Sequence, residues 1–337
     1  MNTKLPFHVF GFLLLGFLLY ISLHIISNAL SPVHPIDTAR KSVIDLHSCQ
    51  IMALSAGHSQ SRAIDFESMN LPGFYSWRNG QDLFETTYKV RQLAPRIPEL
   101  KVVLIPFAYT LLWMDNVAIT SSNRSMLRLE MYNTYPRPTQ IIEGDLQRFI
   151  AGLLAPVVRY DHWLPVLSQI RRGTPADIPI LENGWNTTKL RDRPISSPSE
   201  LFFDSLLKAK YHVLPVQETT ASHPDVLPDL EKLVKGMIEC LQGQDIGVVF
   251  YTPPYFHSYN SLVGTDIILN AQNILKDWIA EYPNASYLDY STHQDFTEET
   301  HLFYDAAHLN GAGAAAFSRL LVQEVDILQR LVRADNP

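Results

Sequence analysis

Two short segments, far apart in the chain, hold the residue types needed for nucleophilic catalysis. One is Gly57-His58-Ser59, which follows an apolar run at 51–56, and the other holds Asp305 and His308, three residues apart. A serine hydroxyl becomes a good nucleophile when a base takes its proton and a carboxylate orients that base. Because an acid and a histidine on one short loop offer both functions, the two segments together indicate a serine activated by an acid–histidine pair.

Simpler explanations exist for each residue taken alone. Serine is common in turns and at helix caps, and Asp305 gains a catalytic meaning only from His308. His58 is better explained as a packing or hydrogen-bonding neighbour of Ser59 than as a second base. The other histidines lack the spacing of a zinc site, although His257 could line a pocket. We therefore expect neither a metal nor a cofactor.

These segments need a scaffold that brings them together, and apolar runs of strand length alternate with helical apolar spacing along the chain. The expected strands cover 51–56, 102–106, 246–251 and 286–290, and the expected helices cover 227–241, 265–282 and 313–328. This alternation predicts an α/β fold with a mostly parallel sheet and helices on both faces. A serine directly after the first strand would lie at the carboxyl edge of the sheet, where such folds place their sites.

The domain organisation follows from where this alternation starts and where it breaks. We predict one large domain over 45–337, with a helical insertion at about 116–214, where prolines are frequent. A nearly unbroken apolar run at 7–26 precedes this domain, and its length matches a bilayer core. We favour an uncleaved transmembrane signal-anchor over 1–30, followed by a juxtamembrane linker over 31–44. The alternative is a cleaved signal peptide, because Ser27-Asn28-Ala29 has the small-x-small form of a cleavage site.

A single span would leave the domain on one side of the membrane, and we expect the periplasmic or extracellular side. In such an oxidising place Cys49 and Cys240 could pair, although two cysteines cannot build a disulfide scaffold and have no CxxC metal spacing. The chain carries 27 Lys and Arg against 34 Asp and Glu, a formal net charge of −7, with no basic run. This balance argues against nucleic acid as a partner, since its binding depends on neutralising phosphates.

The pairing of Gly57-His58-Ser59 with Asp305-x-x-His308-Leu309-Asn310 resembles the SGNH/GDSL hydrolase superfamily. Asn79-Gly80-Gln81 resembles the second block of that superfamily, and the proline-rich 251–255 resembles a turn common in it. The chain is most similar to the membrane-anchored, cell-envelope branch, with teichoic-acid D-alanylation accessory proteins and surface-glycan O-acylation proteins. The resemblance implies a three-layer α/β/α sandwich preceded by one transmembrane helix. The G-x-S-x-G elbow of another hydrolase fold is absent, because Ser61 stands in place of its second glycine.

The resemblance implies a role for each matching residue. Ser59 would be the nucleophile, His308 the general base and Asp305 its orienting acid, while the backbone N–H groups of Ser59 and Gly80 would form an oxyanion hole. Two departures stand out: His58 precedes the serine, where the family has Asp, Asn or Ser, and the third block, with its oxyanion asparagine, is missing. At the matching strand end, Tyr109 or Thr110 could supply a hydroxyl donor instead.

The expected function is that of a membrane-anchored serine acyl esterase or O-acyltransferase acting on a cell-envelope glycan or a lipid-linked substrate. A multi-span membrane acyltransferase is the protein partner that this branch implies. The alternative is a non-catalytic envelope-assembly protein that keeps the fold and binds such an acyltransferase or a polymer. No motif encodes the acyl group, the acceptor, the choice between hydrolysis and transfer, or the oligomeric state.

Overall fold

The computed structural model describes residues 35–113, 197–222 and 226–335, together with Gly11, 14–20, Ser22 and Met131. The described residues from 36 onward, Met131 apart, belong to one compact unit. The predicted signal-anchor lies mostly outside the described residues, and so does the predicted insertion up to residue 196. Among the helices that the structure describes, none combines the length and the hydropathy of a membrane span.

A five-stranded sheet forms the centre of this unit, in the order β2-β1-β3-β4-β5. Every neighbouring pair is parallel, which confirms the predicted α/β class with a parallel sheet. The strands are β1 Ala53–Gly57, β2 Gly73–Trp77, β3 Val102–Pro106, β4 Gly247–Thr252 and β5 Ala285–Asp289. All residues of β1, β3 and β4 are buried, as expected for parallel strands that are covered on both faces.

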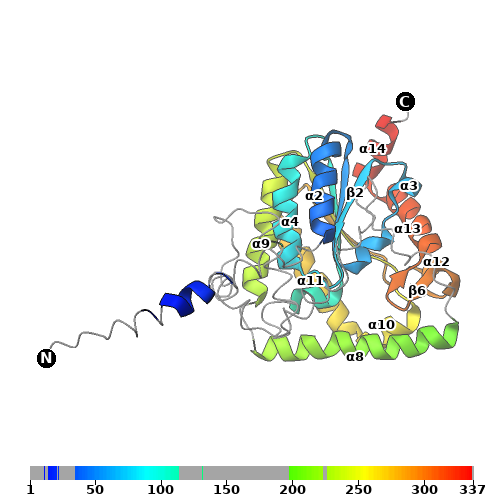
Figure 1. The fold of residues 1–337 in the computed structure, drawn as a ribbon. Helices are drawn as coiled ribbons and strands as arrows, with labels where there is room; N and C mark the ends of the chain where they lie inside the picture. The colour runs from blue at the N-terminus through cyan, green and yellow to red at the C-terminus, as the bar shows by residue number, and fades with distance from the viewer. Residues whose placement is uncertain are drawn as a thin grey trace. The chain divides into compact units, whose positions relative to one another are not determined.

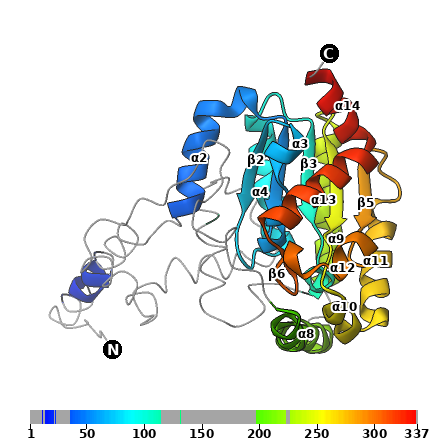
Figure 2. The same ribbon diagram turned by 90° about the vertical axis from the view of Figure 1, so that its right-hand side faces the viewer.

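Helices cover both faces of the sheet (Figure 1). On one face lie α4 Leu83–Leu93, α9 Val226–Gln242 and α11 Thr265–Ile279, and on the other lie α3 Phe66–Met69 and α13 Gly311–Glu324. Figure 2 shows α13 and α3 in front of the sheet, with α4 and α9 behind it. The helix predicted over 313–328 is in fact two helices, because Val325 adopts extended backbone and separates α13 from α14 Asp326–Asp335.

The predicted linker over 31–44 is another difference, because α2 spans Pro35–His47. Proline is well tolerated in the first turn of a helix, and Arg40 and Ile44, one turn apart, are both buried. The Arg40 guanidinium donates a hydrogen bond to the carbonyl of Trp77 and lies 5.5 Å from the centre of its ring. These contacts hold α2 against the end of β2, so the segment is part of the folded unit.

The carboxyl edge of the sheet is crossed by α8 Pro198–Ser222, which packs against α10 His257–Val263 (Figure 1). A small two-stranded antiparallel sheet, β6 Phe303–Asp305 with β7 His308–Leu309, precedes α13. The short helix η2 Ser59–Ala63 follows β1. These four elements surround the site described next.

Candidate active site

Ser59 is presented at the end of β1 by a turn that requires glycine. Gly57 has φ +142°, and a Cβ atom at this position would lie 2.9 Å from Cδ of Pro106 on β3. The absence of a side chain therefore lets β1 and β3 approach closely where the chain leaves the sheet. Because β1 lies between β2 and β3, the strand order reverses here, and open α/β sheets bind their ligands at such a point.

Asp305 and His308 lie on the β6–β7 pair, where they are directly opposite each other. Asn310 follows and caps α13, since its Oδ1 accepts from the N–H of Gly313 at 3.0 Å and its Nδ2 donates to the carbonyl of His301 at 2.7 Å. The N–H of Phe256, next to the proline-rich 251–255, donates to the carbonyl of Ala306 at 3.0 Å. The Asp-x-x-His-Leu-Asn segment is therefore a hairpin followed by a helix cap.

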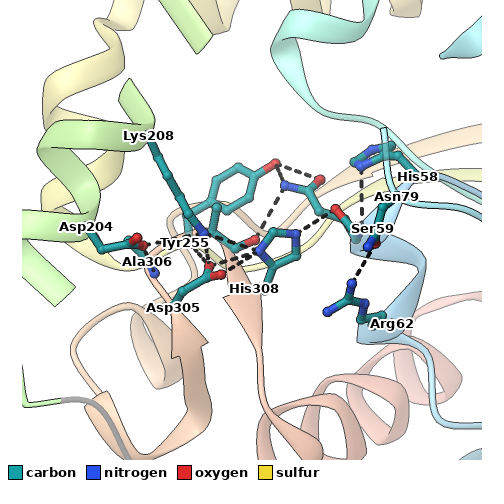
Figure 3. Close-up of polar contacts among 12 residues, drawn as sticks. His58, Ser59, Arg62, Asn79, Asp204, Lys208, Tyr255, Asp305, Ala306 and His308 are labelled. Atoms are coloured by element: carbon teal, nitrogen blue, oxygen red, sulfur yellow. Dashed lines mark hydrogen bonds and ion pairs between the residues drawn. The ribbon is translucent and has the colours of Figure 1, made fainter. Parts of the chain in front are cut away.

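The structure brings Ser59, His308 and Asp305 into one hydrogen-bonded line (Figure 3). Ser59 Oγ lies 2.7 Å from His308 Nε2, and His308 Nδ1 lies 2.8 Å from Oδ1 and 3.0 Å from Oδ2 of Asp305. An acceptor beside Nδ1 favours the tautomer with its proton on that nitrogen. Nε2 is then free to accept the proton of the Ser59 hydroxyl, which is the geometry of a nucleophile with its general base.

Asp305 is held as a carboxylate. Burial alone would raise its pKa, but the charge and the hydrogen bond of His308, followed by those of Lys208, outweigh burial and keep this pKa well below its usual value. The N–H of Ala307 also donates to Oδ1, at 2.9 Å. An ionised Asp305 can both orient His308 and stabilise the imidazolium that forms when Ser59 loses its proton.

Lys208 and Asp204 on α8 are also part of the site, and neither belongs to the two sequence motifs that predicted it. Lys208 forms an ion pair with Oδ1 of Asp305, and its Nζ lies 3.4 Å from both Oδ2 of Asp204 and Nδ1 of His308. Asp204 Oδ2 accepts from the N–H of Ala306 at 2.9 Å. The only local signal was the Asp–Lys pair at i,i+4, which is common on solvated helices.

A buried hydrogen-bond network fixes the position of η2 relative to the β6–β7 hairpin. Gln60 Nε2 donates to the hydroxyl of Tyr255 at 2.7 Å and to the carbonyl of Ala307 at 3.5 Å, and the Tyr255 hydroxyl lies 2.9 Å from Gln60 Oε1. Burial raises the pKa of Tyr255, which therefore remains a neutral phenol. Because Gln60 adjoins Ser59 and Ala307 adjoins His308, this network holds Ser59 and His308 in a fixed position relative to each other.

The turn that carries Gly80 lies beside the end of β1. The N–H of Arg78 donates to the carbonyl of Gly57 at 3.0 Å, and Gly80 itself has φ +68°, a region that favours glycine. Asn79 Oδ1 accepts from the guanidinium of Arg62 at 2.6 Å, and that guanidinium lies 4.9 Å from the centre of the Trp77 ring. Gly80 thus belongs to a turn that is tied to the short helix of Ser59, as an oxyanion donor would need.

The other sequence-predicted pocket residues are placed differently. His58 is buried and caps η2, since its Nδ1 accepts from the N–H of Gln60 at 3.4 Å. The Tyr109 hydroxyl donates to Asn260 at 3.0 Å, and burial raises its pKa. Thr110 follows Tyr109 in the same short helix, η4 Tyr109–Trp113, and is buried, while His257 is exposed at the start of α10. Within the described ranges, no hydrogen bond joins Tyr109, Thr110 or His257 to Ser59 or His308.

Two further features bear on the chemistry of the site. Over the described part of the chain, no group of three or more His, Cys, Asp and Glu side chains is arranged to hold a metal ion. Cys49 is exposed, Cys240 is half-buried, and both are free thiols.

No protein-family model matches the chain, and no curated protein matches it at a significant level. What the site can do therefore follows from its own residues.

Proposed function

We propose that this chain is a membrane-anchored serine acyl esterase or O-acyltransferase, with an SGNH-like domain outside the cytoplasm. The observation that carries the proposal is the line of hydrogen bonds from Ser59 through His308 to Asp305, with distances of 2.7 and 2.8 Å. These distances are within the reach required of a general base and its orienting group. A turn serine without a catalytic role would not need a histidine and a carboxylate from residues about 250 positions away.

The reaction proceeds in two acyl-transfer steps. Ser59 Oγ attacks the ester carbonyl carbon while its proton passes to His308 Nε2, and the carbonyl oxygen becomes an oxyanion facing the N–H groups of Ser59 and Gly80. The carbon–oxygen bond to the leaving alcohol then breaks, and His308 returns the proton to the alkoxide. Water or a sugar hydroxyl next attacks the acyl-serine, gives its proton to His308 and releases the product, and the proton returns to Ser59.

Helix α8, which contributes Lys208 to the site, also has an exposed apolar face. The outward face of α8 exposes four large apolar side chains, those of Phe202, Phe203, Leu206 and Leu207. Lys208 and Asp204, which contact the β6–β7 hairpin, lie on the opposite side of this helix, so the apolar face points away from Ser59, His308 and Asp305. The net charge of −7 disfavours a purely electrostatic grip on an anionic polymer, which leaves local apolar and polar contacts to recognise the substrate.

The proposal is tested with a labelled fluorophosphonate, which reacts with activated serines. We expect the full chain to be labelled covalently and Ser59→Ala to lose labelling by at least about 1,000-fold, because the nucleophile is gone. The matched control is Ser261→Ala, since Ser261 is an exposed serine on α10 that donates only to the carbonyl of His257. Equal labelling of the wild type and Ser59→Ala, with both folded by circular dichroism, would contradict the assignment of the nucleophile.

One observation favours the non-catalytic alternative, an assembly protein that binds a membrane acyltransferase or a polymer. The Tyr109 hydroxyl, a candidate for the missing third oxyanion donor, is already hydrogen-bonded to Asn260. Loss of one such donor costs about 10²–10³ in rate, so a chain without it would be a slow enzyme or none. Complementation of a deletion strain separates the two functions: catalysis requires that Ser59→Ala fails, whereas assembly requires that it works as well as the wild type.

A further inference from the structure

We propose that the guanidinium of Arg62 binds an anionic group of the substrate, a carboxylate or a phosphate, beside the ester that Ser59 attacks. The place of this anion in the reaction rests on the proposed function, whereas its binding to Arg62 can be measured without any turnover. A substrate that carries such a group differs in class from a neutral ester, and Ser59, His308 and Asp305 alone would not distinguish the two.

Arg62 lies on the same face of η2 as Ser59, one turn further along. The helix η2 is a 3₁₀ helix over Ser59–Ala63, and the side chains at positions i and i+3 of such a helix eclipse each other. One turn rises about 6 Å, because each residue adds about 2 Å. Figure 3 shows the guanidinium of Arg62 next to Asn79, on the same side of η2 as Ser59. The cation therefore lies near the serine that is presented to the substrate.

The guanidinium of Arg62 is half-buried and has no carboxylate partner. One of its five N–H groups donates to Asn79 Oδ1 at 2.6 Å. Among the described residues, its buried Nε has no hydrogen-bond partner, and no Asp or Glu forms an ion pair with it. Burial lowers the pKa of Arg62, and the charge of Asp305 offsets this only in part. Because buried charges are normally paired, this guanidinium favours the binding of an anion from outside the chain.

The contacts that Arg62 does make hold its guanidinium in place. The guanidinium lies 4.9 Å from the centre of the ring of Trp77, which is buried at the end of β2. Asn79, its hydrogen-bond partner, is exposed, so the cation extends from the buried ring to the surface. A guanidinium that is fixed in this way loses little freedom when its planar fork binds two oxygens of one carboxylate or phosphate.

The turn of Gly80 relates this cation to the ester. Asn79, which accepts from Arg62, directly precedes Gly80, whose N–H is one of the two proposed oxyanion donors. Ser59, which supplies the other N–H, is one helical turn from Arg62. An anion on Arg62 therefore lies only a few bonds from an ester carbonyl held between these two donors. Arg62 thus supplies locally the positive charge that the net charge of −7 does not.

A purely structural Arg62, one that only ties the turn of Gly80 to η2, makes a different prediction. Its loss would lower stability and labelling to the same extent with or without an anion. The wild type would also respond to phosphate and acetate as it does to chloride. Anion binding is therefore the decisive measurement.

The experiment measures the melting temperature of the full chain in sodium phosphate or sodium acetate at pH 7, with sodium chloride at equal ionic strength as the reference. An anion that binds the folded state raises this temperature by mass action. At about ten times the dissociation constant we expect a rise of roughly 3–6 °C above chloride. The larger of the two rises shows whether Arg62 prefers a phosphate or a carboxylate.

Three variants assign this rise to Arg62. Arg62→Gln should lose it, because the charged fork is gone. Arg319→Gln is the matched control, since Arg319 is exposed on α13, and it should keep the full rise. Ser59→Ala should keep it as well, because the binding of the anion does not require the nucleophile.

A further variant covers the case in which Arg62→Gln does not fold. In Asn79→Asp a carboxylate replaces the amide whose Oδ1 accepts from the guanidinium, so the chain itself supplies the anion. The rise in phosphate or acetate should then fall to the value in chloride. The inference is overturned if the wild type shows no rise above chloride, or if Arg62→Gln, or Asn79→Asp where the first variant is unfolded, keeps the full rise.

The fluorophosphonate reaction relates the anion to Ser59 and separates this inference from the proposed function. An anion on Arg62 occupies space next to Ser59, so it should slow labelling of the wild type as it saturates, and Arg62→Gln should lose this protection. Labelling that the bound anion does not slow would overturn the placement beside Ser59. A rise that depends on Arg62, without any labelling, would contradict the proposed function and leave the anion site supported. Labelling without anion binding would do the reverse.

Discussion

The carboxylate of Asp305 interacts with three donor groups. Oδ1 accepts from the N–H of Ala307 at 2.9 Å, lies 2.8 Å from His308 Nδ1 and pairs with Lys208. The hairpin supplies the first two donors and α8 supplies the third. Because charge-assisted hydrogen bonds to a carboxylate are about twice as strong as neutral ones, this residue stabilises the fold as well as the base.

Asp305→Asn should therefore destabilise the protein in a pH-dependent way. The folded-state pKa of Asp305 lies below the unfolded value of about 3.9, so its contribution is present above pH 4 and is lost as the pH falls toward the folded value. We expect a difference in unfolding free energy between wild type and variant of about 2 kcal/mol at pH 7 that shrinks below pH 4. Urea unfolding of both proteins at pH 7, 4 and 3 measures it.

Asp277→Asn is the control for this titration, since Asp277 is exposed on α11 and its loss should change little at any pH. A difference between wild type and Asp305→Asn that grows toward low pH would contradict the depressed pKa.

At the scale of elements, the start of α13 packs closely against the backbone just before β6. A Cβ at Gly313 would lie 2.2 Å from the carbonyl oxygen of Leu302, a backbone atom that cannot turn aside. The same Gly313 N–H is the donor to Asn310, directly after β7. The first turn of α13 and the position of His308 are thus set by the same contacts.

Gly313→Ala should cost roughly 1–3 kcal/mol of stability, as overpacking does, and should reduce fluorophosphonate labelling because His308 is displaced. Gly236→Ala is the matched control: Gly236 lies within α9, and a Cβ there would meet nothing within 4 Å. That variant should be stabilised by about 0.5–1 kcal/mol, since alanine is the better helix former. Urea denaturation and labelling of both variants give the comparison. A Gly313→Ala variant that is as stable and as fully labelled as the wild type would show that Gly313 does not pack closely against Leu302.

The elements that the sequence predicted were those with a local signal. Continuous apolar runs identified β1, β3, β4 and β5, and helical spacing identified α9 and α11. The strand β2 was missed because GFYSW is short and has no alternation, and α2 was missed because its two inward residues include an arginine. Lys208 could not be predicted at all, since its partner lies 97 positions further along the chain and only the tertiary fold brings α8 to the hairpin.

At the scale of the whole molecule, the candidate site is divided between a strong element and a weak one. Ser59 follows a fully buried central strand, whereas Asp305 and His308 lie on a two-stranded ribbon with an irregular register. A two-stranded ribbon is marginally stable by itself, so this one depends on its contacts with η2, α8 and α10, and a region of this kind opens before the core does. The half of the site that holds the base should therefore loosen first.

In a urea titration of the full chain, we expect labelling of Ser59 to be lost at a lower urea concentration than the far-UV circular dichroism of the helices and the sheet. The wild type labelled after dilution from the same urea concentrations controls for irreversible damage. Coincident curves for labelling and circular dichroism would mean that the ribbon unfolds together with the sheet.

The separation of 249 positions between Ser59 and His308 also sets an order in time. A ribosome makes about 5–20 residues per second, so His308, the proposed base, is synthesised roughly 12–50 s after Ser59, the proposed nucleophile. During that interval Ser59 has no partner to take its proton, and the nascent chain is chemically silent toward any acyl ester it meets. Under the proposed function, reactivity is acquired only when the hairpin packs against η2, so the complete site forms only when folding is complete.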